Sequence, residues 1–220
     1  MRALFSAVIL SLALTLTGPA ARACETALLL AVDVSSSVDP REYRLQIDGV
    51  ADALADPEIA HALVRGQVAL ALMQWSGAGE QEMTLPWQRM TDPAAVADFA
   101  AAARGAKRAY VNSNTAPGDL LARGITALDE VRDCNRLIID VSGDGSANAG
   151  INPRSQSQLA ARKGIIINGI AIESIGISIT QYYERSIITQ YGFVITARRH
   201  EDYPRAIREK IKREITKVTG

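Results

Sequence analysis

Residues 27–37 read Ala-Leu-Leu-Leu-Ala-Val-Asp-Val-Ser-Ser-Ser, an unbroken apolar run followed at once by a polar loop. Such a short continuous apolar run is typical of a strand that is buried on both faces of a parallel sheet. The loop leads to Asp39-Pro40-Arg41-Glu42, which has the features of a helix start: an Asp N-cap, Pro at the first helical position and Glu in the first turn. The sequence here predicts strand, loop and helix, the opening unit of an α/β fold.

The same alternation of strand and helix patterns continues along the chain. Further strands are predicted over 67–75, 81–87, 136–141, 164–172 and 192–196, and the first two of these are joined by the hairpin-like Ser76-Gly-Ala-Gly79. Helices are predicted over 93–103 and 117–131, from about 153 and 180, and at the end, where Ile207, Ile211, Ile215 and Val218 share one face with Lys, Arg and Glu elsewhere. This order predicts one domain with a doubly wound, mostly parallel sheet, helices on both faces and one antiparallel edge strand.

Composition and charge exclude several classes of protein. The 220 residues are 48% hydrophobic and 22% charged, which is ordinary for a folded globular chain. The 24 basic and 24 acidic side chains balance, which argues against a nucleic-acid partner. Two cysteines cannot form a disulfide-dense scaffold or a four-thiolate zinc site. The two histidines, His61 and His200, have no metal-ligand spacing, and we expect both at the surface.

Residues 1–23 have the pattern of an export signal. Arg2 precedes an apolar run over 3–16, Gly18-Pro19 breaks this run, and Ala21-Arg22-Ala23 has the small-x-small form of a cleavage site. A retained membrane anchor and a lipid-modified Cys24 are alternatives that fit the pattern less well. We expect a signal peptide over 1–23, a mature domain over 24–220 without a membrane span, and a periplasmic or extracellular location.

Polar side chains with oxygen atoms follow the predicted buried strands. In open α/β sheets, ligands bind outside the carboxyl ends of the strands, so side chains after different strands should meet there. Carboxylate and hydroxyl oxygens suit a hard divalent cation such as Mg²⁺. The candidate metal ligands are Asp33, Ser35 and Ser37 after the first strand, Thr115 before the helix at 117, and Asp144 after the strand at 136–141.

The string Asp33-x-Ser35-x-Ser37, then Thr115, then Asp144-Gly145 resembles the metal-ion-dependent adhesion site (MIDAS) of von Willebrand factor type A (VWA) domains. The resemblance covers essentially the whole mature chain and is greatest to a bacterial, secreted, single-domain branch of uncharacterised function. It implies a Rossmann-like sheet of order 3-2-1-4-5-6. It also implies that Mg²⁺, Mn²⁺ or Ca²⁺ is bound by three hydroxyls, with Ser113 as the alternative to Thr115, and by the two aspartates directly or through water. One coordination position would then stay open for an acidic group of a protein or peptide ligand.

The two cysteines test this strand order. Cys24 lies nine residues before Asp33, and Cys134 lies ten residues before Asp144. In a 3-2-1-4-5-6 sheet the first and fourth strands are neighbours, so the two thiols would lie side by side at the edge opposite the metal. Export supplies an oxidising compartment. We therefore expect a Cys24–Cys134 disulfide, the alternative being two reduced cysteines.

These features predict an exported metal-dependent binding module and not an enzyme. Aspartyl-phosphate phosphatases have a second aspartate two residues after the nucleophile, and Ser35 stands there instead. The segment Ser142-Gly-Asp-Gly145 is not the Gly-x-Ser-x-Gly elbow of a serine hydrolase. Two alternatives are kept: a structural scaffold with a vestigial metal site, and, with less support, a metal-dependent hydrolase.

Overall fold

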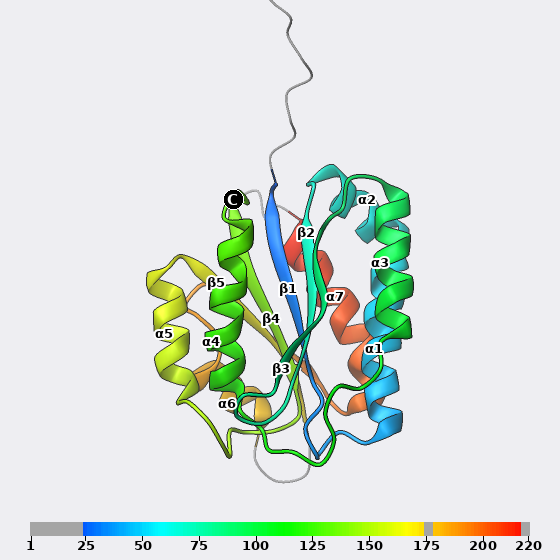
Figure 1. Ribbon diagram of the computed structural model, residues 1–220. Helices are drawn as coiled ribbons and strands as arrows, with labels where there is room; N and C mark the ends of the chain where they lie inside the picture. Colours follow the sequence, from blue (N-terminus) through cyan, green and yellow to red (C-terminus); the bar gives the residue numbers. More distant parts are fainter. Residues whose placement is uncertain (1–23, 174–177, 217–220) are drawn as a thin grey trace, which may run out of the picture.

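The computed structural model describes residues 24–173 and 178–216, which form a six-stranded sheet between two layers of helices (Figure 1). The expected signal peptide over 1–23 and the expected apolar contact of Val218 lie outside the described residues. The strands are β1 Thr26–Asp33, β2 Ala69–Trp75, β3 Gln81–Arg89, β4 Arg136–Gly143, β5 Ile165–Ile172 and β6 Val194–Ala197. The helices are α1 Pro40–Ala55, α2 Pro57–Arg65, α3 Pro93–Gly105, α4 Pro117–Ala127, α5 Pro153–Arg162, α6 Ile179–Ser186 and α7 Tyr203–Ile215, with 3-10 turns at Leu128–Val131 and His200–Asp202.

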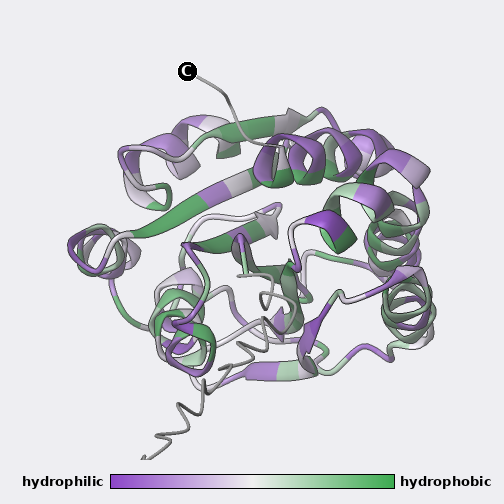
Figure 2. Ribbon diagram, turned by 90° about the horizontal axis from the view of Figure 1, so that it is seen from above, coloured by the Kyte–Doolittle hydropathy of each residue, from purple (hydrophilic) through white to green (hydrophobic). Residues whose placement is uncertain are grey.

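The sheet has the order β3-β2-β1-β4-β5-β6, and only the β2–β3 pair is antiparallel, which confirms the expected topology. β1 lies between β2 and β4, and every one of its residues is buried. Helices α1, α2, α3 and α7 cover one face, and α4, α5 and α6 cover the other (Figure 1). Figure 2 shows hydrophobic residues along the strands and mixed polarity along the helices around them. The carboxyl ends of the five parallel strands therefore point to one edge of the sheet.

An aspartate cap before proline starts three of the helices. The Asp39 carboxylate accepts a hydrogen bond from Glu42 N at 2.7 Å, and the Glu42 carboxylate accepts one from Asp39 N at 2.8 Å, which completes a capping box. Asp56 caps α2 in a similar way, and Asp92 caps α3. Helix α2 was missed by the sequence analysis, although Asp56-Pro57-Glu58 has the same start signal as α1.

The expected disulfide is confirmed. Cys24 and Cys134 are bonded, with their Cα atoms 4.4 Å apart. The pairing register of β1 with β4, in which Thr26 lies opposite Arg136, brings the two cysteines together just before these strands begin. The bond therefore lies at the edge of the sheet opposite the carboxyl ends. Among the described residues, no helix is long and apolar enough to cross a membrane.

Helix α7 differs in part from the expectation. Ile207, Ile211 and Ile215 are buried as predicted, but Lys210 and Glu214 are buried as well, so the prediction that its charges lie away from the core is wrong for these two. The Lys210 ammonium lies 2.5 Å from Asp140 Oδ1 on β4 and 2.6 Å from Glu214 Oε1. The helix therefore packs on the sheet through a buried ionic cluster as well as through isoleucines.

Candidate metal centre

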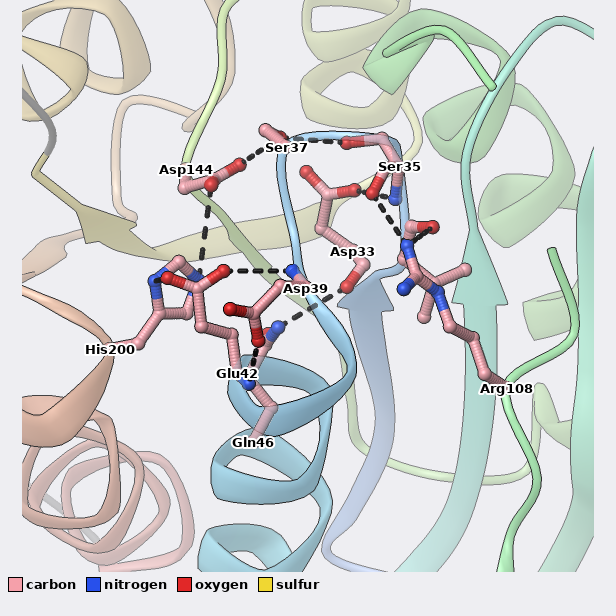
Figure 3. Close-up of polar contacts among 10 residues, drawn as sticks. Asp33, Ser35, Ser37, Asp39, Glu42, Gln46, Arg108, Asp144 and His200 are labelled. Carbon is pink, nitrogen blue, oxygen red and sulfur yellow. Dashed lines mark hydrogen bonds and ion pairs between the residues drawn. The ribbon is translucent and has the colours of Figure 1, made fainter. Parts of the chain in front are cut away.

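Three loops meet at the carboxyl edge of the sheet, and backbone hydrogen bonds hold them together. Ser36 N, in the loop after β1, donates a hydrogen bond at 3.0 Å to Ser113 O, which lies in the loop before α4. The Arg108 guanidinium crosses from that same loop and donates to Val34 O at 2.9 Å and to Ser35 O at 2.8 Å (Figure 3). The backbone around the candidate ligands is therefore positioned by contacts between loops that are distant in sequence.

Four of the five candidate ligands form one chain of polar contacts (Figure 3). Asp33 Oδ1 accepts a hydrogen bond from Ser35 N at 2.7 Å, which turns the loop back over the end of β1. The hydroxyls of Ser35 and Ser37 lie 3.2 Å apart. The Ser37 hydroxyl then donates to Asp144 Oδ1 at 2.6 Å, which joins the β1 loop to the end of β4. The structure thus brings together residues that are 107 positions apart in the sequence.

Thr115 reaches the same place from the third loop. Its backbone N donates to Asn148 Oδ1 at 2.8 Å, which ties it to the loop that follows Asp144. Its hydroxyl faces Gly145, where an added Cβ would lie 3.6 Å from Thr115 Oγ1. The hydroxyl of Ser113, the alternative ligand, instead donates to the Glu80 carboxylate. The geometry therefore favours Thr115 over Ser113.

The electrostatics of Asp33 fit a cation. Asp33 is fully buried, and its Oδ2 has no hydrogen-bond partner among the described residues. Burial raises the pKa of Asp33 to about 7, and the negative charge of Asp144 contributes to the same shift. A divalent cation between the two aspartates would offset both causes and favour the ionised carboxylates. The unpartnered oxygen and the all-oxygen donor set both suit a hard divalent ion.

One basic neighbour of this centre, His200, was not anticipated. His200, which we expected at the surface, is buried: its Nδ1 lies 3.0 Å from Glu42 Oε1 and its Nε2 lies 3.9 Å from Asp144 Oδ2 (Figure 3). The physical reason is that His200 follows β6 and so lies at the same edge as the candidate ligands. The position of His200 directly after a predicted strand was the one sequence feature that could have placed it near the centre. Its spacing from other residues gives no such indication.

The centre is unlike sites built from histidines, cysteines and carboxylates alone. Within 24–173 and 178–216, no group of three or more such side chains could hold a metal ion. The candidate centre has two carboxylates, so the three hydroxyls of Ser35, Ser37 and Thr115 are needed to complete a set of donors. The role of these five residues as metal ligands stays a prediction.

A family of proteins of unknown function matches nearly the whole chain. The family model described as "Protein of unknown function (DUF1194)" matches residues 23–219. The chain belongs to this family. No curated protein matches the chain in sequence. Membership of the DUF1194 family by itself indicates no activity.

Solved structures confirm that this DUF1194 protein has the VWA fold. Proximal thread matrix protein 1 from the mussel byssus, in a structure with a zinc-occupied MIDAS motif, matches with a TM-score of 0.65 at 16% identity over 88% of this chain and 46% of that one. The von Willebrand factor type A protein from Catenulispora acidiphila matches with a TM-score of 0.60 at 15% identity, over 87% and 43% of the chains. The vWF domain of the type V pili tip protein Mfa5 from Porphyromonas gingivalis matches with a TM-score of 0.60 at 10% identity, over 91% and 99%. The chain spans less than half the length of the first two.

Proposed function

We propose that this protein is an exported binding module that captures an acidic protein or peptide ligand through a divalent cation, Mg²⁺, Mn²⁺ or Ca²⁺. The observation that carries the proposal is the convergence of Asp33, Ser35, Ser37, Thr115 and Asp144 at one edge of the sheet. The zinc-occupied MIDAS motif of the mussel protein supports a divalent cation in this fold. The disulfide and the pilus-tip relative support export to the periplasm or the medium.

The chain's own residues explain why the ligand would be acidic. Ser35, Ser37 and Thr115 contribute neutral oxygens, so only the two aspartates would neutralise a bound cation. A bound cation supplies a Lewis-acidic position that attracts a further carboxylate. Ser37 is exposed, which leaves one side of the centre open to a partner, whereas Asp33 and Ser35 are fully buried and hold the other side rigid.

The arrangement of the polar groups supports binding over catalysis. The Ser37 hydroxyl contacts the Asp144 carboxylate, and His200 lies on the far side of that carboxylate. A serine hydrolase needs the reverse order, in which the imidazole contacts the hydroxyl and the carboxylate orients the imidazole. A binding module is therefore the function that this geometry supports best.

Metal binding is the first test. We expect the EDTA-treated domain to bind one Mn²⁺ or Mg²⁺ per chain in isothermal titration, and Asp144→Ala to abolish the binding while the fold is kept. The bound ion should also raise thermal stability, because a ligand at about 100 times its Kd adds ~2.7 kcal/mol to the free energy of unfolding. The matched control is Asp98→Ala, which removes an exposed carboxylate on α3. Absence of binding at millimolar metal, or binding unchanged in Asp144→Ala, would contradict the proposal.

The acidic partner is tested with a peptide display library selected on the metal-loaded domain and eluted with EDTA. We expect the eluted peptides to share an Asp or Glu whose replacement by Asn or Gln abolishes binding. The control selection uses the Asp144→Ala domain, which should enrich no such peptides. Eluted peptides without a shared acidic residue would count against an acidic ligand and would leave metal binding itself standing.

A further inference from the structure

Among the buried polar atoms of the described residues that lack a hydrogen-bond partner, two belong to Asp33 and Tyr183 at the candidate metal centre. Among the described residues, neither Asp33 Oδ2 nor the Tyr183 hydroxyl forms a hydrogen bond, and both residues are fully buried. Buried polar groups in folded proteins are hydrogen-bonded in the great majority of cases, so each exception needs an explanation. Tyr183 lies on α6 and is not among the five candidate ligands.

Both atoms face the same point, which lies over Gly143 at the end of β4. A Cβ added to Gly143 would lie 2.7 Å from Asp33 Oδ2 and 2.8 Å from the Tyr183 hydroxyl oxygen. A Cβ added to Gly169 on β5 would lie 2.6 Å from Tyr183 Cδ1. The absence of side chains at these two glycines leaves room for the Tyr183 ring to lie along this face of the sheet and to point towards Asp33. One water molecule, or a small shift of either side chain, is enough to join the two oxygens.

The chemistry of the two groups is complementary. A tyrosine hydroxyl has an ordinary pKa of about 10, so at neutral pH it keeps its proton and can donate a hydrogen bond. An ionised carboxylate can only accept hydrogen bonds. The protonated Tyr183 phenol can therefore donate a charge-assisted hydrogen bond to the Asp33 carboxylate. Such a bond is stronger than one between neutral groups.

Helix α6 is itself fixed at this edge of the sheet. The Glu173 carboxylate, directly after β5, accepts hydrogen bonds from Ile179 N at 3.0 Å and from Thr180 N at 3.1 Å in the first turn of α6. Tyr183 is therefore presented from a helix whose start is anchored to the strand ends. A rigid support of this kind is what a residue that orients a metal ligand requires.

We propose that Tyr183 is a positioning residue of the metal centre: its hydroxyl donates a hydrogen bond, directly or through one water molecule, to Asp33 Oδ2 and holds the ionised carboxylate in the orientation that binds the cation. This inference rests on the proposed function, because it assigns Tyr183 to the same centre. Outer partners of metal ligands typically change metal affinity by about 10–100-fold when they are removed.

The test is Mn²⁺ titration of Tyr183→Phe, with the thermal stability of the metal-free domain as the second readout. We expect Kd for Mn²⁺ to rise about 10–100-fold. Metal-free stability should change little, because the phenyl ring keeps the packing of the phenol and the net contribution of a single hydrogen bond is small. A purely structural role would instead lower metal-free stability and leave Kd unchanged.

Tyr203→Phe is the matched control. Tyr203 is also fully buried, but its hydroxyl lies 3.2 Å from Ser142 Oγ and contacts no candidate ligand. We expect this control to lose some stability and to keep the Kd of the wild type. Gly143→Ala is the second variant, because its methyl group would separate Asp33 from Tyr183, and we expect it to weaken Mn²⁺ binding at least as much as Tyr183→Phe.

The outcomes separate this inference from the proposed function. A wild-type domain that binds no metal overturns both. A wild-type domain that binds metal, with Tyr183→Phe within about twofold of its Kd, overturns only the role of Tyr183. Equal losses of affinity in Tyr183→Phe and Tyr203→Phe would indicate a general effect of disturbing the core and would also overturn it.

Discussion

Replacing Lys210 with Met is expected to lower the free energy of unfolding by about 3–5 kcal/mol, because breaking a buried ion pair leaves uncompensated charge in the core. Lys210 is fully buried, and its ammonium lies 2.5 Å from Asp140 Oδ1 and 2.6 Å from Glu214 Oε1. Asn168 adds a hydrogen bond to Glu214 Oε1 at 2.7 Å and carries no charge. Without the lysine, two carboxylates share a site that has no cation.

The pH dependence of this loss has a definite sign. Burial raises the pKa of Asp140 to about 7, with the Lys210 charge acting in the opposite direction. A carboxyl whose folded pKa lies above its unfolded pKa binds more protons in the folded state, so its contribution to stability falls as pH rises from about 4 through 7. Removing Lys210 raises this pKa further. The loss in Lys210→Met should therefore be larger at about pH 8 than at about pH 5, where the carboxyls take up protons.

Urea unfolding of the wild type and of Lys210→Met at about pH 5 and about pH 8 measures the loss in the free energy of unfolding at each pH. Lys212→Met is the matched control on the same helix, because the Lys212 ammonium lies 2.5 Å from the exposed Glu58 carboxylate. Exposed pairs of this kind contribute about 0.2–1 kcal/mol, so the control should change little. A loss in Lys210→Met no greater than in Lys212→Met, or greater at the lower pH, would contradict the ionic account of this cluster.

Replacing both Cys24 and Cys134 with Ala is expected to lower the free energy of unfolding by about 4–5 kcal/mol in the chain-entropy model. The disulfide joins residues 110 positions apart, so it removes a large amount of conformational freedom from the unfolded chain. It also holds the segment before β1 against the segment before β4, where Asn135 N donates to Cys24 O at 2.9 Å. The double substitution leaves the atoms of that backbone contact in place and removes the covalent link together with two buried sulfur atoms.

The measurement is denaturant unfolding of the double variant beside the wild type under oxidising conditions. A second wild-type sample with a reducing agent should approach the double variant in stability. The Kd for Mn²⁺ should be unchanged, because the disulfide lies just before β1 and β4 begin, whereas the candidate metal centre lies where these strands end. A loss below about 1 kcal/mol would show that the loop-closure account is wrong for this protein.

Much of the fold could be predicted because the signals are local. The run at 27–32 is apolar at every position, which is a property of a central strand regardless of what surrounds it. Asp39-Pro40 and Glu42 form a cap within one helical turn, so the same residues that gave the signal make the contacts. The disulfide prediction was not local: it used the strand order that the resemblance implied and two similar offsets along parallel strands.

The candidate centre was predicted in part for the same reason. Parallel strands end at one edge, so side chains placed after β1 and β4 must come close to each other, and the Ser37–Asp144 hydrogen bond is the result. The choice between Ser113 and Thr115 depended on Glu80, which comes from a different loop and accepts the Ser113 hydroxyl. No spacing within 112–115 contains that information.

The sequence by itself determined the α/β class, the start of α1, the mostly parallel sheet and the set of oxygen-bearing side chains at the strand ends. Only the tertiary structure decided that Lys210 and Glu214 face the core and that His200 is buried beside Asp144. It also decided that the Tyr183 ring lies over Gly169 and Gly143 and points towards Asp33. The physical reason is that periodicity shows which face of an element is apolar. A charged or polar side chain is buried only where another element supplies its partner, and that partner is set by packing across the sheet.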